Sequence, residues 1–198
     1  MKTFDETRHS FEHEKDRRVS TEVDGQEPAK PRVDVFLNPK PVAESASEMV
    51  QYVLPNHANP LGALLGGQLM HWIDLAGGLA AYRHSRSYVV TASIDHLDFL
   101  VPGRVGDLVI LRSSVNRVFR TSLEVGVKVW VEHDLSNERS HLSSAYLTFV
   151  AVDRHGRTLQ VSPVLPQSED EKRRYEDAGI RREIRQAEKV RKLERLKP

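Results

Sequence analysis

The residues best suited to chemistry lie between positions 66 and 82. Asp74 is the only acidic residue in this otherwise apolar stretch, and a carboxylate in apolar surroundings is costly unless it is paired, so such positions often have a functional reason. Gly66 and Gly67 open the same predicted helix, so their N–H groups are among the donors that a helix N-terminus leaves unsatisfied. Amide donors followed by a carboxylate eight residues later are typical of an acyl-transfer or hydrolysis site, where the amides polarise a carbonyl.

Structural interpretations of the same residues stay open. Asp74 could face solvent or cap a neighbour, and two glycines also suit any tight junction between a loop and a helix. His71 lies three residues before Asp74, but a single histidine is more often structural than a ligand. The nine histidines show no metal-ligand spacing, so no metal site is predicted. The signature motifs of α/β-hydrolases, zinc proteases, P-loops and dinucleotide-binding folds do not occur.

One helix must position these groups. Leu69, Ile73, Ala76 and Ala80 follow helical spacing, and apolar or small residues occur nearly all round, which predicts a buried helix. The glycines and alanines at 76–80 include poor helix formers. We therefore expect a sheet to approach the helix closely at this point.

Five strands are predicted around the helix. One covers 45–54, and four follow the helix at 87–97, 107–118, 122–133 and 141–152. The clearest is 122–133, where Leu and Val at every second position alternate with mostly polar or small residues. Turn residues at 102–103, 120–121 and 136–137 make the links short, which forces antiparallel neighbours. The sequence thus predicts an α+β fold, a curved antiparallel sheet wrapped around one long central helix.

Composition limits the class of protein. The 198 residues include 29 Lys and Arg, 28 Asp and Glu, and no Cys, for a net charge of +1. This near balance argues against a general nucleic-acid binder. The absence of cysteine excludes disulfides, thiolate metal sites and a cysteine nucleophile, and it fits a reducing compartment. No secretory signal and no apolar stretch of about 18 residues is visible, so we expect a cytoplasmic protein without a membrane span.

Three segments are expected along the chain. Residues 1–40 are polar and predict a largely disordered tail, in which Val33, Val35 and Leu37 could dock as a short edge strand. Residues 41–166 form the central domain, and residues 167–198 form a charged helical extension. Ser168 with Glu171 is a capping-box pattern that opens this helix, and Gly179 is expected to interrupt it. The charge run also fits a solvated helix or a frayed tail.

Three blocks of sequence resemble one family. "NPLGALLGGQLMHWIDLAGGLAA", "VVTASIDHLDFLVPGRVGDLV" and "RTSLEVGVKVW" occur in this order and resemble the acyl-CoA thioesterases of the hotdog fold, most like the YciA and cytosolic acyl-CoA hydrolase branch. The resemblance covers about residues 45–165. It implies hydrolysis of fatty acyl-CoA to free acid and CoA, in a homodimer with one continuous sheet and often in a hexamer of three dimers. No cofactor is implied, because coenzyme A is part of the substrate.

The resemblance also assigns roles to the first group of residues. It implies that Asp74 is the catalytic carboxylate, acting as general base for water or as nucleophile. Gly66 and Gly67 would polarise the thioester carbonyl from the helix N-terminus. Asn59 matches an asparagine common in the preceding loop, and Thr91 lies on a strand that lines the pocket, where it could position water or substrate.

A second group is implied to bind coenzyme A. Thr121 and Ser122 match a turn that contacts CoA, with Arg120 and Arg117 near the phosphates. Phe119 stands where relatives usually carry a glycine, which could alter the CoA entrance. The segment "PVLPQSEDEKRRYEDA" also resembles the family's C-terminal extension, which could pack on the oligomer or near this entrance.

Two more residues differ from the family pattern, and two functions other than thioester hydrolysis stay open. Leu61 and Leu65 stand where relatives often carry asparagine and an aromatic residue or histidine. A hotdog dehydratase acting on hydroxyacyl-carrier protein would pair a histidine with a carboxylate, and His57 is the nearest candidate. A non-catalytic acyl-CoA sensor is the other alternative, which the basic tail at 181–197 keeps open. Asp74 in a dry pocket would favour an enzyme.

Overall fold

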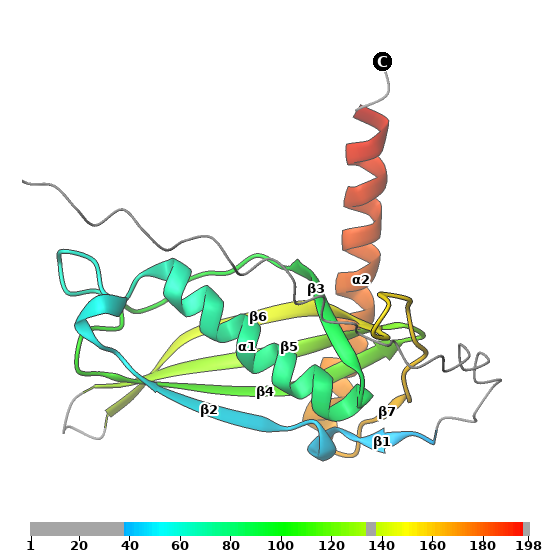
Figure 1. Cartoon of the computed structure of the whole chain (residues 1–198), viewed down its shortest axis with the longest axis horizontal. Helices are drawn as coiled ribbons and strands as arrows, with labels where there is room; N and C mark the ends of the chain where they lie inside the picture. Colours follow the sequence, from blue (N-terminus) through cyan, green and yellow to red (C-terminus); the bar gives the residue numbers. More distant parts are fainter. Residues whose placement is uncertain (1–37, 134–137, 196–198) are drawn as a thin grey trace, which may run out of the picture. The chain divides into compact units, whose positions relative to one another are not determined.

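A five-stranded antiparallel sheet wraps around helix α1 (Gly66–Ser85) in the computed structural model (Figure 1). The structure describes residues 38–133 and 138–195. The spatial order of the strands is β2-β4-β5-β6-β3, so β2 and β3 form the two edges. These strands are β2 (Ser47–Tyr52), β3 (Tyr88–Ile94), β4 (Leu108–Phe119), β5 (Ser122–His133) and β6 (Glu138–Val152). The predicted α+β architecture is confirmed. The expectation that the short link at 102–103 joins neighbouring strands is wrong, because β3 pairs with β6 whereas β4 pairs with β2 and β5.

Several short elements escaped prediction. β1 (Lys40–Pro41) pairs in parallel with β7 (Val164–Leu165), and two 3₁₀ turns, η1 (Val42–Glu44) and η2 (Pro55–His57), flank β2. Two-residue strands carry no periodic signal, which is why the pattern of side chains did not indicate them. The edge strand expected at 33–37 and the turn expected at 136–137 lie outside the described residues.

The core lies between α1 and the inner face of the sheet. The alternation predicted for β5 is confirmed, because its five inward-facing side chains are at most 2% exposed: Leu123, Val125, Val127, Val129 and Val131. A Cβ atom on Gly77 would lie 3.1 Å from the Phe149 ring on β6. This distance confirms the close approach of helix and sheet that the small residues predicted.

The end of α1 is anchored by a buried histidine. His84 is fully buried, and its Nε2–H donates to the carbonyl oxygen of Ser162 at 2.8 Å. Burial lowers the pKa of His84 below its ordinary value of 6.5, although the bond to Ser162 opposes that shift. The folded state therefore favours the neutral form of the His84 ring. Arg86 ends the helix in the left-handed region, with a φ of 53°.

One face of α1 differs from the prediction. Met70, Leu75, Leu79 and Tyr82 are 43–53% exposed and recur at helical spacing, so the predicted burial all round is wrong for the single chain. The cause is that the sheet covers only one side of the helix. The neighbouring edge strand β3 has only β6 beside it, and it adds further exposed apolar side chains to the same region.

A second helix, α2 (Glu169–Arg195), follows the sheet. The capping box is confirmed: the Ser168 N–H donates to Glu171 Oε2 at 3.1 Å, and the Glu171 N–H donates to Ser168 Oγ at 3.2 Å. The predicted interruption at Gly179 is wrong, because the helix continues through it. A Cβ there would overlap Arg117 Nη1, so the glycine makes room for a guanidinium. Neither α1 nor α2, the helices of the described residues, is long and apolar enough to cross a membrane.

Candidate functional site

Asp74 lies on the exposed face of α1, with its carboxylate held by the edge strand. Thr91 Oγ1 on β3 donates to Asp74 Oδ1 at 2.7 Å. Asp74 is half-buried and Thr91 is exposed in the single chain, so the dry pocket expected around Asp74 is not closed by one chain alone. The Thr91 bond fixes one carboxylate oxygen and leaves Oδ2 able to accept a proton.

The bond follows from local sheet geometry. Thr91 pairs with Phe149 and Ser93 pairs with Thr148, so the register shifts by one residue at Ala92. Such a bulge re-aims the side chains beside it. Thr91 therefore reaches Asp74 from the last position before the irregularity.

Gly66 and Gly67 form the first turn of α1, as predicted. Leu65 is the N-cap and gives no side-chain cap, so the backbone N–H groups of this turn keep their donor capacity. A Cβ on Gly67 would meet nothing within 4 Å, whereas one on Gly66 would lie 3.4 Å from the Phe99 ring. The helix N-terminus thus presents amides to open space at Gly67 and beside an aromatic ring at Gly66.

Asn59 organises the loop that leads to these glycines. Its Oδ1 accepts hydrogen bonds from the N–H of Leu61 at 2.9 Å and from the N–H of Ala63 at 3.1 Å. The Asn59 N–H in turn donates to the Ala63 carbonyl at 2.8 Å. The side-chain oxygen is thereby committed to the fold of the loop. Its Nδ2 amide is the group that could donate to a ligand.

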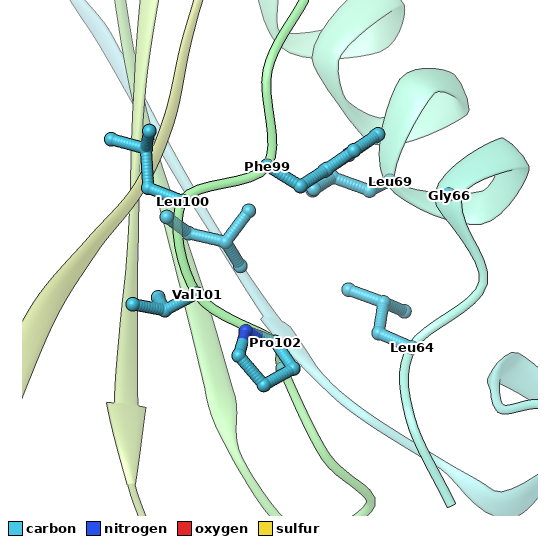
Figure 2. A pocket seen from close by; sticks show the side chains of 9 residues that line it. Leu64, Gly66, Leu69, Phe99, Leu100, Val101 and Pro102 are labelled. Atoms are coloured by element: carbon cyan, nitrogen blue, oxygen red, sulfur yellow. The ribbon is translucent and has the colours of Figure 1, made fainter. Parts of the chain in front are cut away.

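An apolar cavity of about 380 Å³ lies beside the N-terminus of α1. Its lining includes Gly66, Leu69 and Phe99, together with Leu64, Leu100, Val101, Pro102, Gly103 and Leu142. Figure 2 shows the Phe99 side chain next to Leu69 and near Gly66. An apolar wall next to backbone amides can hold a hydrocarbon chain while its carbonyl meets the donors.

Within one chain, the amide donors and the carboxylate are too far apart to act together. Eight residues separate Gly66 from Asp74, which is about 12 Å along a helix that rises about 1.5 Å per residue. An oxyanion donor must lie roughly 3 Å from the oxygen that it stabilises, and a general base must be equally near the attacking water. The Gly66 and Gly67 amides and the Asp74 carboxylate of one helix therefore cannot contact the same small reacting group.

The turn predicted to contact CoA joins β4 to β5. Arg120 is exposed and has a positive φ of 44°, which makes it, rather than Phe119, the strained residue of the turn. The Ser122 hydroxyl donates to the Phe119 carbonyl at 3.4 Å. Ser122 pairs with Val150, and Val150 pairs with Val90, so the turn lies at the level of Thr91, two strands away across the sheet.

Arg117 is engaged with the C-terminal helix. Its guanidinium carbon lies 4.3 Å from the centroid of the Tyr175 ring on α2, and Nη1 donates to the Tyr175 carbonyl at 3.3 Å. Arg117 also lies over the Phe119 ring, at 5.4 Å. The structure thus brings Arg117 to the turn, as predicted, but uses its guanidinium to hold α2.

A charge cluster under α2 was missed by the sequence pattern. The Glu124 side chain is fully buried and accepts hydrogen bonds from Arg181 at 2.7 Å, Arg185 at 3.0 Å and Asn116 at 3.2 Å. Arg185 also pairs with Asp95, and partial burial raises the pKa of Asp95 despite the opposing effect of Arg185. Glu124 occupied an outward-facing position of β5, where alternation alone indicates solvent. Only the docking of α2 buries it.

His57 is occupied structurally. Its Nδ1 accepts a hydrogen bond from the Leu54 N–H at 3.2 Å, and its ring packs edge-on against Trp72 at 5.2 Å. This geometry disfavours the dehydratase alternative, because the ring is held by a backbone amide and an indole rather than by a carboxylate. No cluster of three or more His, Cys, Asp or Glu residues suited to a metal ion occurs within 38–133 and 138–195.

Comparison with known proteins decides the family. The model of the thioesterase superfamily matches residues 61–137. The acyl-CoA thioester hydrolase YkhA of Bacillus subtilis is 41% identical over 128 residues, which cover 65% of this chain and 74% of that protein. The chain belongs to the acyl-CoA thioesterase family of the hotdog fold. Acyl-coenzyme A thioesterase 11 of mouse is 35% identical over 75% of this chain, but the chain spans only 25% of that relative's length.

Solved structures of the family share the fold. A hexameric acyl-CoA thioesterase is 41% identical, with a TM-score of 0.74 over 76% of this chain and 97% of that one. The Staphylococcus aureus acyl-CoA hydrolase, solved with butyryl coenzyme A and coenzyme A, is 32% identical, with a TM-score of 0.74 over 79% of this chain and 96% of that one. These neighbours confirm the hotdog fold expected from the three sequence blocks.

Proposed function

We propose that the chain is an acyl-CoA hydrolase that converts fatty acyl-CoA and water to free fatty acid and CoA. The observation that carries this proposal is the bond from Thr91 to Asp74, which orients a carboxylate on the exposed apolar face of α1. Asp74 takes a proton from water, and the resulting hydroxide attacks the thioester carbon. The C–S bond then breaks, and the thiolate of CoA leaves and is protonated. Direct attack by the Asp74 carboxylate on the thioester is the alternative chemistry at the same position.

The carbonyl oxygen gains negative charge as water adds. The amides of Gly66 and Gly67 donate to it, at the positive end of the helix dipole. Because about 12 Å of helix separates these amides from Asp74 of the same chain, the proposed site combines the amides of one protomer with Asp74 of a second. The reaction consumes only acyl-CoA and water, and coenzyme A enters as part of the substrate.

A homodimer provides that second chain. Met70, Leu75, Leu79 and Tyr82 form a 43–53% exposed stripe on the face of α1 that also carries Asp74. Beside it, β3 is an edge strand with unpaired backbone groups and exposed Val90. Pairing of β3 with a second β3 would cover both features and close the pocket around Asp74. Because a 41% identical relative is hexameric, we propose a dimer as the minimal unit and three dimers as the full assembly.

Variants of the Staphylococcus aureus hydrolase support the choice of residues. Structures of that hydrolase exist with an asparagine, an aspartate or a threonine replaced by alanine. In that protein the three positions are 15 and then 17 residues apart, and Asn59, Asp74 and Thr91 have the same two spacings here. We therefore propose that Asp74 performs the proton transfer, that Thr91 orients it, and that the Nδ2 amide of Asn59 donates to water or substrate.

The CoA moiety is proposed to bind at the β4–β5 turn. Arg120 and the Thr121 hydroxyl provide donors there, and Ser122 lies beside them, at the same end of the sheet as Thr91. A human relative, 31% identical, is named a cytosolic acyl coenzyme A thioester hydrolase. We propose a cytoplasmic location for this chain as well.

The test is hydrolysis of acyl-CoA by the protein. The reaction is measured by the release of free thiol, for a series of acyl-CoA substrates that differ in acyl chain length. Asp74→Asn should lower kcat by about 10²–10⁴-fold, the usual contribution of proton transfer by a positioned side chain, without changing the oligomer. Glu48→Gln, an exposed carboxylate on the opposite edge strand that pairs with Arg112, is the matched control and should keep full activity. Equal kcat values for Asp74→Asn and the unaltered chain would refute the assignment.

The two alternatives give different results in the same experiment. A dehydratase would remove water from a 3-hydroxyacyl substrate and leave the thioester intact. A non-catalytic sensor would bind acyl-CoA tightly and release no thiol.

A further inference from the structure

We infer that Arg182 of α2 binds a phosphate group of the CoA moiety, so that the C-terminal helix forms part of the substrate site. This inference rests on the proposed function and adds a binding residue that neither the sequence pattern nor the family resemblance assigned.

Arg182 is held directly against that turn. Its guanidinium carbon lies 4.2 Å from the centroid of the Phe119 ring, and Nη1 donates to Ser122 Oγ at 3.4 Å. The side chain is half-buried, so its orientation is set by packing. A guanidinium carries five N–H donors, and this contact engages one of them. The remaining donors have the planar geometry that binds phosphate in a bidentate manner.

Arg182 has no carboxylate partner within residues 38–133 and 138–195. Its neighbours on α2, Arg181 and Arg185, pair with Glu124 and Asp95. No carboxylate among the described residues lies within ion-pair distance of Arg182. Arg182 is therefore a fixed cation with unused donors, which is the arrangement that an anionic ligand completes.

The surroundings of the turn favour a phosphate in particular. Arg120 is exposed at the turn itself, and the Arg117 guanidinium also lies over the Phe119 ring. Two guanidinium groups, those of Arg117 and Arg182, thus lie over the Phe119 ring, and a third arginine, Arg120, stands in the turn itself. Since Arg117 donates to the Tyr175 carbonyl, Arg182 and Arg120 are the members best placed to contact a ligand.

The clamp around Glu124 explains how α2 can supply a binding residue. Arg181 and Arg185 enter the buried carboxylate from positions that flank Arg182 on the helix. Arg181 also lies over the Tyr146 ring, at 3.6 Å. These ion pairs hold the helix backbone on both sides of Arg182, which keeps this residue beside the turn. The turn lies two inter-strand spacings, about 10 Å, from Thr91 across the sheet, so a substrate bound at the reaction centre can extend toward it.

The experiment compares two substrates with the same acyl group. One is the acyl-CoA that the enzyme hydrolyses fastest, and the other is the matching acyl-pantetheine, which lacks the phosphates and the nucleotide. Arg182→Ala should raise KM for acyl-CoA about 10-fold, as expected for the loss of a charge-assisted bond, with little change in kcat. Its KM for acyl-pantetheine should equal that of the unaltered chain. Arg191→Ala, an exposed arginine farther along the same helix, is the control and should leave both values unchanged.

Three outcomes would overturn the inference. They are an unchanged KM for acyl-CoA, an equal rise for both substrates, which would show a purely structural role, and an effect of Arg191→Ala as large as that of Arg182→Ala. If Arg182→Ala fails to fold, Arg182→Lys takes its place, because it keeps the charge and the aliphatic stem but not the bidentate geometry. It should raise KM for acyl-CoA alone.

Failure of the proposed function is recognised separately. If the unaltered chain hydrolyses neither substrate, the proposed function is wrong, and binding of free coenzyme A is measured by titration calorimetry. Weaker binding of coenzyme A by Arg182→Ala than by Arg191→Ala would still support the phosphate contact. Equal binding by the two variants would refute it.

Discussion

Replacing Glu124 by alanine would test whether the buried clamp holds α2 on the sheet. Removing one partner of a buried ion pair commonly costs about 3–5 kcal/mol of folding free energy, because the other charge stays buried without compensation. Here the side chains of Arg181 and Arg185 are 21% exposed, so both can turn partly toward water and recover some solvation. Asn116 also loses its acceptor. We therefore expect a loss of about 3 kcal/mol in the free energy of unfolding, at the lower end of that range.

The loss should be measured by urea unfolding at a fixed protein concentration, because oligomerisation couples stability to concentration. Glu132→Ala is the matched control on the same strand. Glu132 pairs with Arg139 at the surface, where side chains are 25% and 41% exposed, and an exposed pair contributes about 0–1 kcal/mol. Hydrogen exchange should also accelerate in α2 near residue 181 in Glu124→Ala while remaining slow in α1.

A cost for Glu124→Ala no larger than that of Glu132→Ala would refute the reasoning. Unchanged hydrogen exchange in α2 of Glu124→Ala would refute the claim that the clamp holds this helix. A double-mutant cycle of Glu124→Ala with Arg181→Ala isolates the pair, and we expect a coupling of about 1–3 kcal/mol between them.

Two further predictions concern the core. Burial lowers the pKa of His84 from 6.5, so its contribution to stability is complete above that pH and is lost as the pH falls through 6.5 toward the lower folded-state value. Melting temperatures between pH 8 and 5 should therefore fall more for the unaltered chain than for His84→Gln. Equal slopes of melting temperature against pH would contradict the assignment. Gly77→Ala would place a Cβ 3.1 Å from the Phe149 ring and should cost about 1–3 kcal/mol through overpacking. Phe149→Leu in the same chain should recover part of that loss, and full stability of Gly77→Ala alone would show that the helix can shift.

The elements that are periodic were predictable from the sequence. The alternation from Leu123 to Val131 indicated β5 with the bounds that the structure shows, because each inward position meets the same core. Ser168 and Glu171 indicated the start of α2 for an equally local reason, since both hydrogen bonds of a capping box lie within one turn.

What depends on distant parts of the chain was not predictable. Glu124 has the pattern of a solvent-facing residue, and only the guanidinium groups of α2 make its burial tolerable. Gly179 has a low helix propensity, but its lack of a Cβ is used for contact with Arg117, so the helix continues. In both cases tertiary packing outweighed the local preference.

The candidate site likewise contains residues that the sequence indicated and features that only the structure revealed. Asp74, Gly66 and Gly67 were indicated by their types and spacing, and the structure places them on one helix as expected. Their distance within that helix, and the exposure of its apolar stripe, became evident only when the sheet was seen to cover one side. Nothing about Arg182 differs in sequence from the other arginines of the tail, so its place beside Ser122 required the structure.

The eight-residue interval on α1 has a consequence for how activity responds to dilution. If each reaction centre takes its amides from one chain and its carboxylate from another, a dissociated chain holds no working centre at all. Specific activity would then fall on dilution in step with the fraction of chains that remain paired. A mixture of two inactive variants, one altered at Asp74 and one at the Gly66–Gly67 turn, would regain turnover after subunit exchange, because each mixed pair contains one intact combination.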